Sequence, residues 1–469
     1  MSAEHETQTP KGRRKNGKAL RQEVALSSHG EWTPAADRPD PISLLQAQDE
    51  GRIQELIPIR YGRMLESPFA FLRGSAVVMA SDLAGTPSTD IQAILCGDAH
   101  LSNFGVFASP ERRLIFDIND FDETYPGPWE WDLKRLAASA VVAGRENGFT
   151  EKKCRSLAVD LTRKYVDAMD KFSKANTLDV WYYHVEADRL VEVFEKTSKR
   201  GKKRAAKMMK KARTKTHQQT MEKLTHFEAG RRRINSDPPL LVPIREWGLE
   251  NYLSEDNLLT QIEQHVDDSW SQYLESLPDE RRFLLRQYQI KDAALRVGGV
   301  GSVGTRCIIC LLEGEAEDDA LILQLKEAGS SVLESFLTTR RYKDHAHRVV
   351  TGQRLMQAVS DIFLGWHTSK LSGRNFYWRQ LKDMKGSAEV SEMDFESLRT
   401  YLGVCVVCLA RAHARTGNGA SISGYIGKSD SFPKAIGDFA TLYANQTERD
   451  YQALVEAVES GRIAAETGI

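Results

Sequence analysis

Residues 97–132 place the tightest limits on how this 469-residue chain folds. They read GDAHLSNFGVFASPERRLIFDINDFDETYPGPWEWD, in which carboxylates alternate with short apolar runs. Asp98 and Asn103 follow one such run, and Asp120 follows another. Acidic residues framed by Phe, Ile and Trp are unusual for a simple solvated loop, because charged side chains rarely lie among apolar ones without a partner. We therefore predict a polar site held at strand ends.

The residue types in this stretch suit phosphoryl transfer, which needs an oriented hydroxyl, a divalent metal and a cradle for phosphates. Asp98 can orient the hydroxyl, and Asn103 with Asp120 can supply the hard oxygen ligands that Mg²⁺ prefers. Asp117 and Asp122 are alternatives to Asp120 as metal ligands, because alternation along a strand places some of these acids on one side. A Ca²⁺ site is the competing interpretation.

A glycine-rich segment far downstream is a candidate cradle for phosphates. Gly299, Gly301 and Gly304 form a G-x-G-x-x-G pattern, which is weak evidence by itself. A dinucleotide fold would need a helix after it, but β-type residues follow at 306–312. We therefore expect the glycines in a hairpin connection that covers phosphates.

Lys326 ends the next predicted strand, where its ammonium can reach phosphate oxygens as a point charge. Glu334, or Glu327 near it, is our candidate for the carboxylate that holds this lysine. Arg73, followed by Gly and Ser, offers another cation to a phosphate, although a structural role is at least as well supported.

The catalytic motifs resemble a known group of enzymes. GDAHLSNFG is similar to the GDxHxxN catalytic loop of aminoglycoside phosphotransferases and related kinase-like enzymes, and NDFDETYPGPWEWDLKRLA to their metal-binding segment. The resemblance implies that Asp98 is the catalytic base and that Asn103 and Asp120 bind metal. It implies structural support from His100 and Asp132. Over about residues 40–460 the chain also resembles a bacterial family called domain of unknown function 2252.

The order of these motifs is reversed relative to ordinary kinase-like chains, which place the glycine-rich hairpin and lysine first. The sequence LARAHART at 409–416 resembles the helix end that immediately precedes the catalytic loop in those phosphotransferases. We therefore expect an α+β, two-lobed, protein-kinase-like fold that is circularly permuted, with a helix-rich larger lobe and a small antiparallel β lobe. The expected divisions are a mobile polar tail (1–40), a helix-rich catalytic lobe (41–290), a β-rich nucleotide-covering lobe (291–390) and returning helices (391–469).

Composition sets few limits on partners. The formal net charge is −1, so no overall field favours nucleic acid or membranes. The basic segment 196–215 permits binding to nucleic acid or another polyanion, but a solvated helical face is favoured. No apolar run is long enough to span a membrane and no signal peptide is recognisable, so we expect a cytoplasmic protein. Two C-x-x-C pairs, at 307–310 and 405–408, suggest zinc by spacing alone, but their apolar context favours core packing.

Together these features predict a phosphotransferase that uses ATP and Mg²⁺ and acts on a hydroxyl of a small molecule. A nucleotide-binding pseudokinase, acting as a regulatory module, is one alternative. A metal-dependent phosphohydrolase that uses the same acidic cluster is another. The sequence leaves open the acceptor, the oligomeric state, and whether a phosphoryl or an adenylyl group is transferred.

Overall fold

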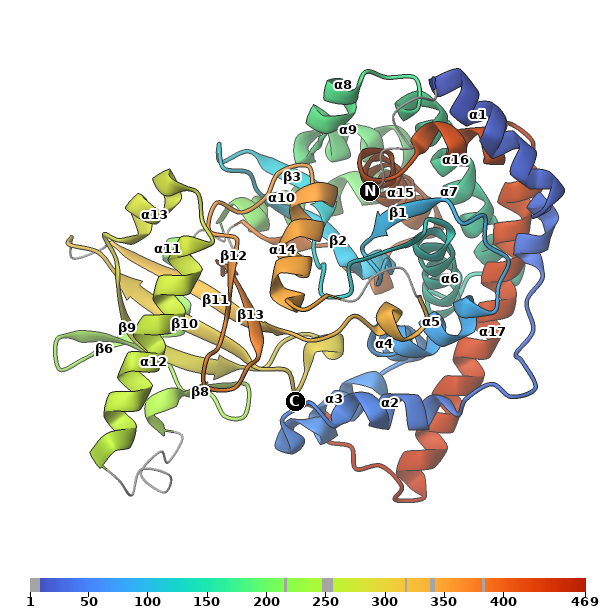
Figure 1. Ribbon diagram of the computed structural model, residues 1–469. Helices are drawn as coiled ribbons and strands as arrows, with labels where there is room; N and C mark the ends of the chain where they lie inside the picture. Colours follow the sequence, from blue (N-terminus) through green and yellow to red (C-terminus); the bar gives the residue numbers. More distant parts are fainter. Residues whose placement is uncertain (1–8, 215–216, 247–255, 317–318, 338–341, 382–383) are drawn as a thin grey trace.

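The computed structural model describes residues 9–214, 217–246, 256–316, 319–337, 342–381 and 384–469, and its architecture is α+β. Figure 1 shows a large helix-rich body beside a smaller body built on a twisted antiparallel sheet. We call the described residues between 217 and 381 the sheet lobe, and the remaining described residues the helical lobe. The chain enters the helical lobe first, crosses to the sheet lobe, and returns.

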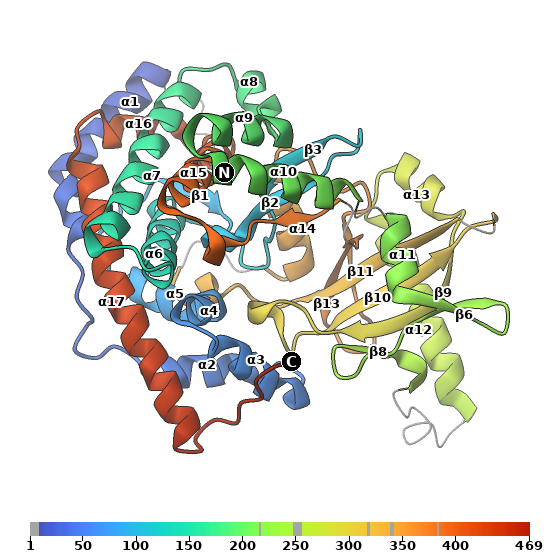
Figure 2. The same cartoon turned by 180° about the vertical axis from the view of Figure 1, so that it is seen from behind.

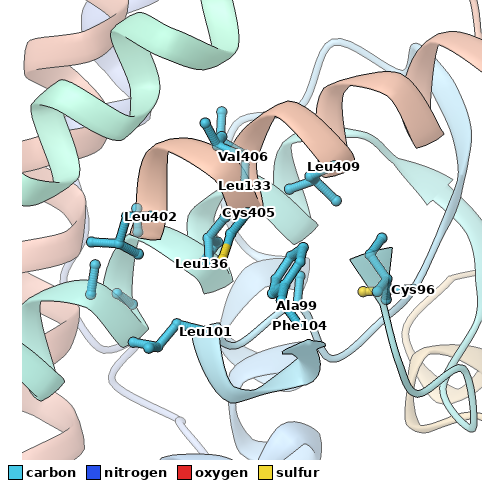
Figure 3. Packing of buried hydrophobic residues seen from close by; sticks show 14 of the residues in the cluster. Cys96, Ala99, Leu101, Phe104, Leu133, Leu136, Leu402, Cys405, Val406 and Leu409 are labelled. Carbon is cyan, nitrogen blue, oxygen red and sulfur yellow. The ribbon is translucent and has the colours of Figure 1, made fainter. Parts of the chain in front are cut away.

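Four long helices form the centre of the helical lobe and pack against one another: α6 (Glu130–Glu146), α7 (Glu151–Phe172), α15 (Phe395–Thr416) and α17 (Ser431–Glu459). Figure 3 shows side chains of α6 (Leu133 and Leu136) in one apolar cluster with Cys405 and Leu409 of α15. Helix α6 is buried along almost its whole length, and its first turns carry buried charged residues, among them Asp132 and Arg135, which therefore need partners. This helix is therefore a fixed element on which the neighbouring loops can be positioned.

Shorter helices surround this centre. Pro58 and Pro68 stand in the first turns of α3 and α4, where a missing N–H costs nothing. The shorter helices are α1 (Pro10–Ala19), α2 (Pro41–Asp49), α3 (Ile57–Met64), α4 (Pro68–Gly74), α5 (Ala76–Ala84), α8 (Thr177–Tyr182), α9 (Ala187–Thr197), α10 (Lys199–Thr214) and α16 (Gly419–Ile426).

Two small antiparallel sheets in the helical lobe position the acidic stretch. One pairs β1 (Gln92–Leu95) with β4 (Tyr125–Pro128). The other has the order β14-β2-β3-β5, with bounds β2 (Phe104–Ala108), β3 (Leu114–Ile118), β5 (Val185–Glu186) and β14 (Gly386–Ser387). The Asn119 N–H donates to the Asn103 carbonyl at 2.9 Å. The loops 96–103 and 119–124 therefore lie side by side at the strand ends.

The sheet lobe is built on a six-stranded antiparallel sheet with the order β12-β13-β11-β10-β9-β8. The glycine-rich segment connects the first two of three consecutive paired strands, β9, β10 and β11. The strands and helices of the sheet lobe are β6 (Thr225–Glu228), β7 (Arg231–Ile234), β8 (Leu241–Pro243), β9 (Gln289–Arg296), β10 (Cys307–Glu313), β11 (Ala320–Ala328), β12 (Gly365–Thr368), β13 (Asn375–Gln380), α11 (His217–Leu224), α12 (Asp256–Glu275), α13 (Asp279–Leu285) and α14 (His345–Met356).

The sheet lobe begins earlier in the chain than the expected boundary at 291. Strand β10 buries alternate residues on opposite faces, with Cys310 and Leu312 in one cluster and Ile309 and Leu311 in another. Residues of α12 and α13 complete the first cluster, and Met221 of α11 belongs to the second. A sheet with two apolar faces needs other elements packed on both. The segment before β9, which contains α11, α12 and α13, therefore packs with the sheet and not with the helical lobe.

The expected mobile tail is wrong for the described residues 9–40. Helix α1 packs on α16 at the outer surface of the helical lobe (Figure 2). Gly17 is buried there, and Arg21 donates to the carbonyl oxygens of Gly424 and Tyr425 at 2.9 and 2.5 Å. His29 is fully buried and lies 2.7 Å from the Tyr425 hydroxyl. The prediction relied on the polar composition of this segment, but a few small and hydrogen-bonding residues are enough to make its contact with α16. Residues 1–8 lie outside the described part.

Helix α10 makes up most of the basic segment 196–215, and its thin apolar side (Ala205, Met209 and Ala212) packs into the main core. Across the described ranges, no helix combines the length and the apolar character required to cross a membrane. All six cysteines lie in described parts of the chain, where they are buried thiols.

Candidate active site

A cavity of about 700 Å³ lies where the two lobes meet. The loops 96–103 and 119–124 of the helical lobe line it together with the glycine-rich segment and strand β11 of the sheet lobe. The predicted residues that line it are Asp98, His100, Asn103, Asp120, Asp122, Gly299, Gly301 and Lys326. Two stretches that are far apart in the sequence thus form one site.

Lys326 joins the two lobes. Its ammonium nitrogen is 3.6 Å from a carboxylate oxygen of Asp120 and also forms an ion pair with Asp122, which accepts a hydrogen bond from the Tyr377 hydroxyl at 2.7 Å. Burial by itself lowers the pKa of Lys326, but the charges of Asp120 and Asp122 outweigh burial and raise the pKa well above its usual range. Lys326 is therefore a buried cation within reach of any group bound at Asp120.

Glu334 does not hold Lys326, which corrects the prediction. Its carboxylate lies 3.6 Å from His345 and 3.7 Å from Arg348, and it caps the short helical turn that begins after Ser331. The alternative, Glu327, forms ion pairs with two arginines of the sheet lobe. Strand alternation explains the result, because Glu327 follows Lys326 directly and so points to the opposite face.

Asp98 is held by Arg135 of α6, which donates to its carboxylate at 2.5 Å and to the Leu72 carbonyl at 2.8 Å. His100 lies 3.6 Å from the other carboxylate oxygen, and burial lowers its pKa to about 4, so it is neutral at pH 7. Sequence reasoning missed Arg135. The available signal was weak: Arg135 lies beside the apolar run 136–144, where a buried charge needs a partner, but Glu130, Asp132 and Lys134 lie in the same turns and nothing local singles it out.

Asn103 links the two loops. Its side-chain oxygen accepts from the Asp120 N–H at 2.8 Å, and its nitrogen donates to the carbonyls of Asp98 and Asp120, each at 3.1 Å. An amide oxygen has a second lone pair, so this bond leaves Asn103 able to ligate a metal. The amide therefore fixes the spacing between Asp98 and Asp120.

The three neighbouring aspartates have different surroundings. Asp117 is buried and accepts two bonds from Arg411 at 2.8 Å. Both oxygens of Asp122 have partners. Asp120 keeps one buried oxygen, Oδ1, with no hydrogen-bond partner in the described part of the chain. Desolvation raises the pKa of Asp120, but nearby cations, chiefly Lys326, outweigh it and hold this pKa well below its usual range. Asp120 is therefore an ionised acceptor with an unused oxygen.

The unused oxygen of Asp120 fits a divalent cation. Within the described ranges, no three His, Cys, Asp or Glu side chains are grouped so as to enclose a metal by themselves. Mg²⁺ commonly uses only one or two carboxylates and takes its other ligands from water and substrate phosphates. Asp120 and Asn103 suit such an ion, whereas Asp122 is already engaged.

Asp132 braces the start of the loop 96–103. Its two oxygens accept from the backbone N–H groups of Cys96 and Gly97 at 2.8 and 3.0 Å, and His413 lies 3.4 Å away. Gly97 has a φ of +81°, and a Cβ there would lie 2.1 Å from the Glu123 carbonyl oxygen. Only glycine fits this turn, which sets the direction of the loop.

The glycine-rich segment is docked on the helical lobe and is not an exposed hairpin tip. Arg52 donates to the Val303 carbonyl at 2.5 Å, and Arg63 donates to the Gly298 carbonyl. Gly304 has a φ of +86° and does not line the cavity, so its role is in the turn. Gly299 and Gly301 remain the members that face the site.

The fold and cavity define a two-lobed α+β chain with a polar site between the lobes. The chain belongs to a bacterial family described as "Uncharacterized protein conserved in bacteria (DUF2252)", whose model matches residues 52–457. No curated protein and no solved structure matches the chain.

Proposed function

We propose that the protein is an ATP- and Mg²⁺-dependent phosphotransferase that acts on a hydroxyl group, with a circularly permuted kinase-like fold. The observation that carries the proposal is the 3.6 Å separation of Lys326 from Asp120 in the cavity that Asp98 also lines. A shared nucleotide requires such proximity, because the lysine and the metal ligand must reach the same phosphates.

Each site residue has a separate role in the proposed phosphoryl transfer. Lys326 holds phosphate oxygens, and Asp120 with Asn103 would hold Mg²⁺, which when bound neutralises charge on the phosphates. Asp98, fixed by Arg135, orients the acceptor hydroxyl and accepts its proton. An ion pair with Arg135 makes the Asp98 carboxylate a weaker base. This is compatible with its role, because phosphoryl transfer depends more on positioning than on a strong base.

The arrangement of elements supports the kinase-like part of the proposal. A glycine-rich segment between two strands and a lysine on the third strand are features of protein kinases. The end of α15 lies beside β1, where the Thr416 hydroxyl accepts from the Ile94 N–H at 3.2 Å. The segment that resembles the helix before a kinase catalytic loop is therefore next to that loop in space, although it follows it by some 300 residues. If the chain of an ordinary kinase-like fold were opened between this helix and the catalytic loop, and its former ends were joined, the motifs would follow one another in the order seen here.

The test is Asp98→Asn, assayed as ADP release over a panel of small hydroxyl compounds. We expect turnover to fall by about 10²–10⁴-fold, the usual range for a positioned base, while the affinity for nucleotide is unchanged. Asp438→Asn, at an exposed aspartate of α17, is the control. Full activity of Asp98→Asn would exclude Asp98 as the base. ATP binding without consumption would instead indicate a binding module.

A second variant separates transfer from hydrolysis. Gly301 lines the cavity, and a Cβ there meets only the Arg73 carbonyl at an ordinary 3.5 Å, so we expect Gly301→Val to be accommodated, which thermal unfolding of the variant checks. A kinase-like enzyme should then lose ATP affinity, because the added side chain enters the phosphate cradle. A phosphohydrolase would keep its activity and would release phosphate without any acceptor.

A further inference from the structure

Arg73, at the end of α4, is a half-buried arginine without a partner. It lines the cavity, and in the described ranges its side chain donates no hydrogen bond and forms no ion pair; its Nε is fully buried. Neighbouring arginines are satisfied, since Arg135 contacts Asp98 and Arg63 donates to a carbonyl. Burial lowers the pKa of Arg73, and the charges of Asp98 and Glu66 offset this only in part. A partly desolvated cation with no contacting acceptor is costly, so its acceptor is expected to come from the cavity.

Arg73 lies on the Asp98 side of the cavity. Arg135 joins the Asp98 carboxylate to the carbonyl of Leu72, the residue just before Arg73. Phe69, on the same short helix, contacts the His100 ring edge-on. The positive charges that act on Asp120 come instead from Lys326 and from residues 379 and 385. Arg73 and Arg135 therefore lie at the Asp98 end of the cavity, whereas Lys326 lies at the Asp120 end.

We propose that Arg73 binds an anionic group of the acceptor, so that the substrate carries a phosphate or a carboxylate as well as the hydroxyl oriented by Asp98. This inference rests on the proposed phosphotransferase function. The planar fork of a guanidinium matches the two oxygens of either anion and fixes the direction of the bound molecule. Arg73 and Asp98 would then hold the acceptor at two points, which is the requirement for aligning one hydroxyl with a phosphate.

The experiment measures anion binding by calorimetry with the full-length protein. Inorganic phosphate and malonate serve as probes, each added to protein saturated with Mg²⁺ and a non-hydrolysable ATP analogue. The variants are Arg73→Gln and Arg73→Lys, and Arg155→Gln, at a surface arginine of α7, is the charge-matched control. The affinities for the ATP analogue and for ADP are measured in parallel.

We expect the parent and Arg155→Gln proteins to bind one anion probe. Arg73→Gln should weaken that binding by about 10- to 100-fold, the effect of a lost hydrogen bond to a charged group, and Arg73→Lys should weaken it less. The affinities for both nucleotides should be unchanged. Preference for phosphate or malonate identifies which anion the acceptor carries.

Two outcomes would overturn the inference. Weaker binding of the ATP analogue but not of ADP by Arg73→Gln would place Arg73 at the γ-phosphate. Equal anion binding by Arg73→Gln and the parent would show that Arg73 holds no ligand. A failure of the proposed function can be told apart from a failure of this inference. If the proposed function is wrong, the parent protein binds no nucleotide, and this is seen before any variant is compared.

Discussion

At the scale of the residue, neighbouring aspartates have different roles because each carboxylate meets different partners. Asp117 is paired inside the core with Arg411, and Asp122 is engaged by Lys326 from the other lobe. Asp120 alone of these three retains an oxygen without a partner in the described chain. The chemistry available to an acid therefore depends on which oxygens remain free: those of Asp117 are engaged in the core, whereas Asp120 keeps one that a ligand could use.

The first prediction concerns the buried pair of Asp117 and Arg411. Asp117→Ala should lower the free energy of unfolding by about 3–5 kcal/mol, because it leaves a buried guanidinium without its counter-charge. Urea unfolding at neutral pH measures the change. The control is Asp438→Ala, which removes an exposed pair and should cost at most about 1 kcal/mol. Equal costs for the two variants would show that the Asp117 pair does not stabilise the core.

At the scale of the element, the N-terminal segment shows how one small residue docks a helix. A Cβ at Gly17 of α1 would lie 2.0 Å from the Ser421 carbonyl oxygen of α16, so the two backbones touch there. A Cβ at Gly12, on the same helix, meets only the Thr9 hydroxyl at 3.5 Å. The contact between α1 and α16 therefore depends on Gly17 and not on helix propensity.

The second prediction compares these two glycines. Gly17→Ala should destabilise the docked helix by about 1–3 kcal/mol, the usual cost of overpacking, and should speed protease cleavage in α1. Gly12→Ala should be neutral or slightly stabilising, because alanine favours helix without a clash. Denaturant unfolding and limited proteolysis of the two variants provide the comparison. Equal behaviour would mean that α1 is not docked through Gly17.

At the scale of the whole molecule, the loop 119–124 is held by both lobes. Arg348 of α14 is buried and donates to the carbonyls of Asp122 and Thr124, and the Val332 N–H donates to Glu123 at 2.7 Å. Lys326 adds the ion pair with Asp122. A ligand bound at Asp120 would therefore stabilise the junction of the lobes and not only one of them.

The third prediction follows from this junction. ATP with Mg²⁺ at 100 times its Kd should raise the free energy of unfolding by about 2.7 kcal/mol, because only the folded chain binds it. EDTA should remove most of this gain, and so should Lys326→Met, measured against its own ligand-free state. Lys174→Met, at an exposed lysine, is the control. A full gain in Lys326→Met would exclude that lysine from the nucleotide site.

The sequence by itself determined the local features. The spacing of Asp98, Asn103 and Asp120 and the apolar runs before them placed a polar site at strand ends. This inference succeeds because the alternation of apolar and polar residues acts over a few residues.

Only the tertiary structure decided which distant residues meet. It placed Arg135 on Asp98 and Asp122 on Lys326, docked the N-terminal segment, and left Arg73 without a partner in the described chain. Each of these contacts joins residues brought together by packing, and no local pattern records which of several arginines or carboxylates will be nearest. The free oxygen of Asp120 is therefore a property of the folded chain, whereas the presence of an acid at that strand end is a property of the sequence.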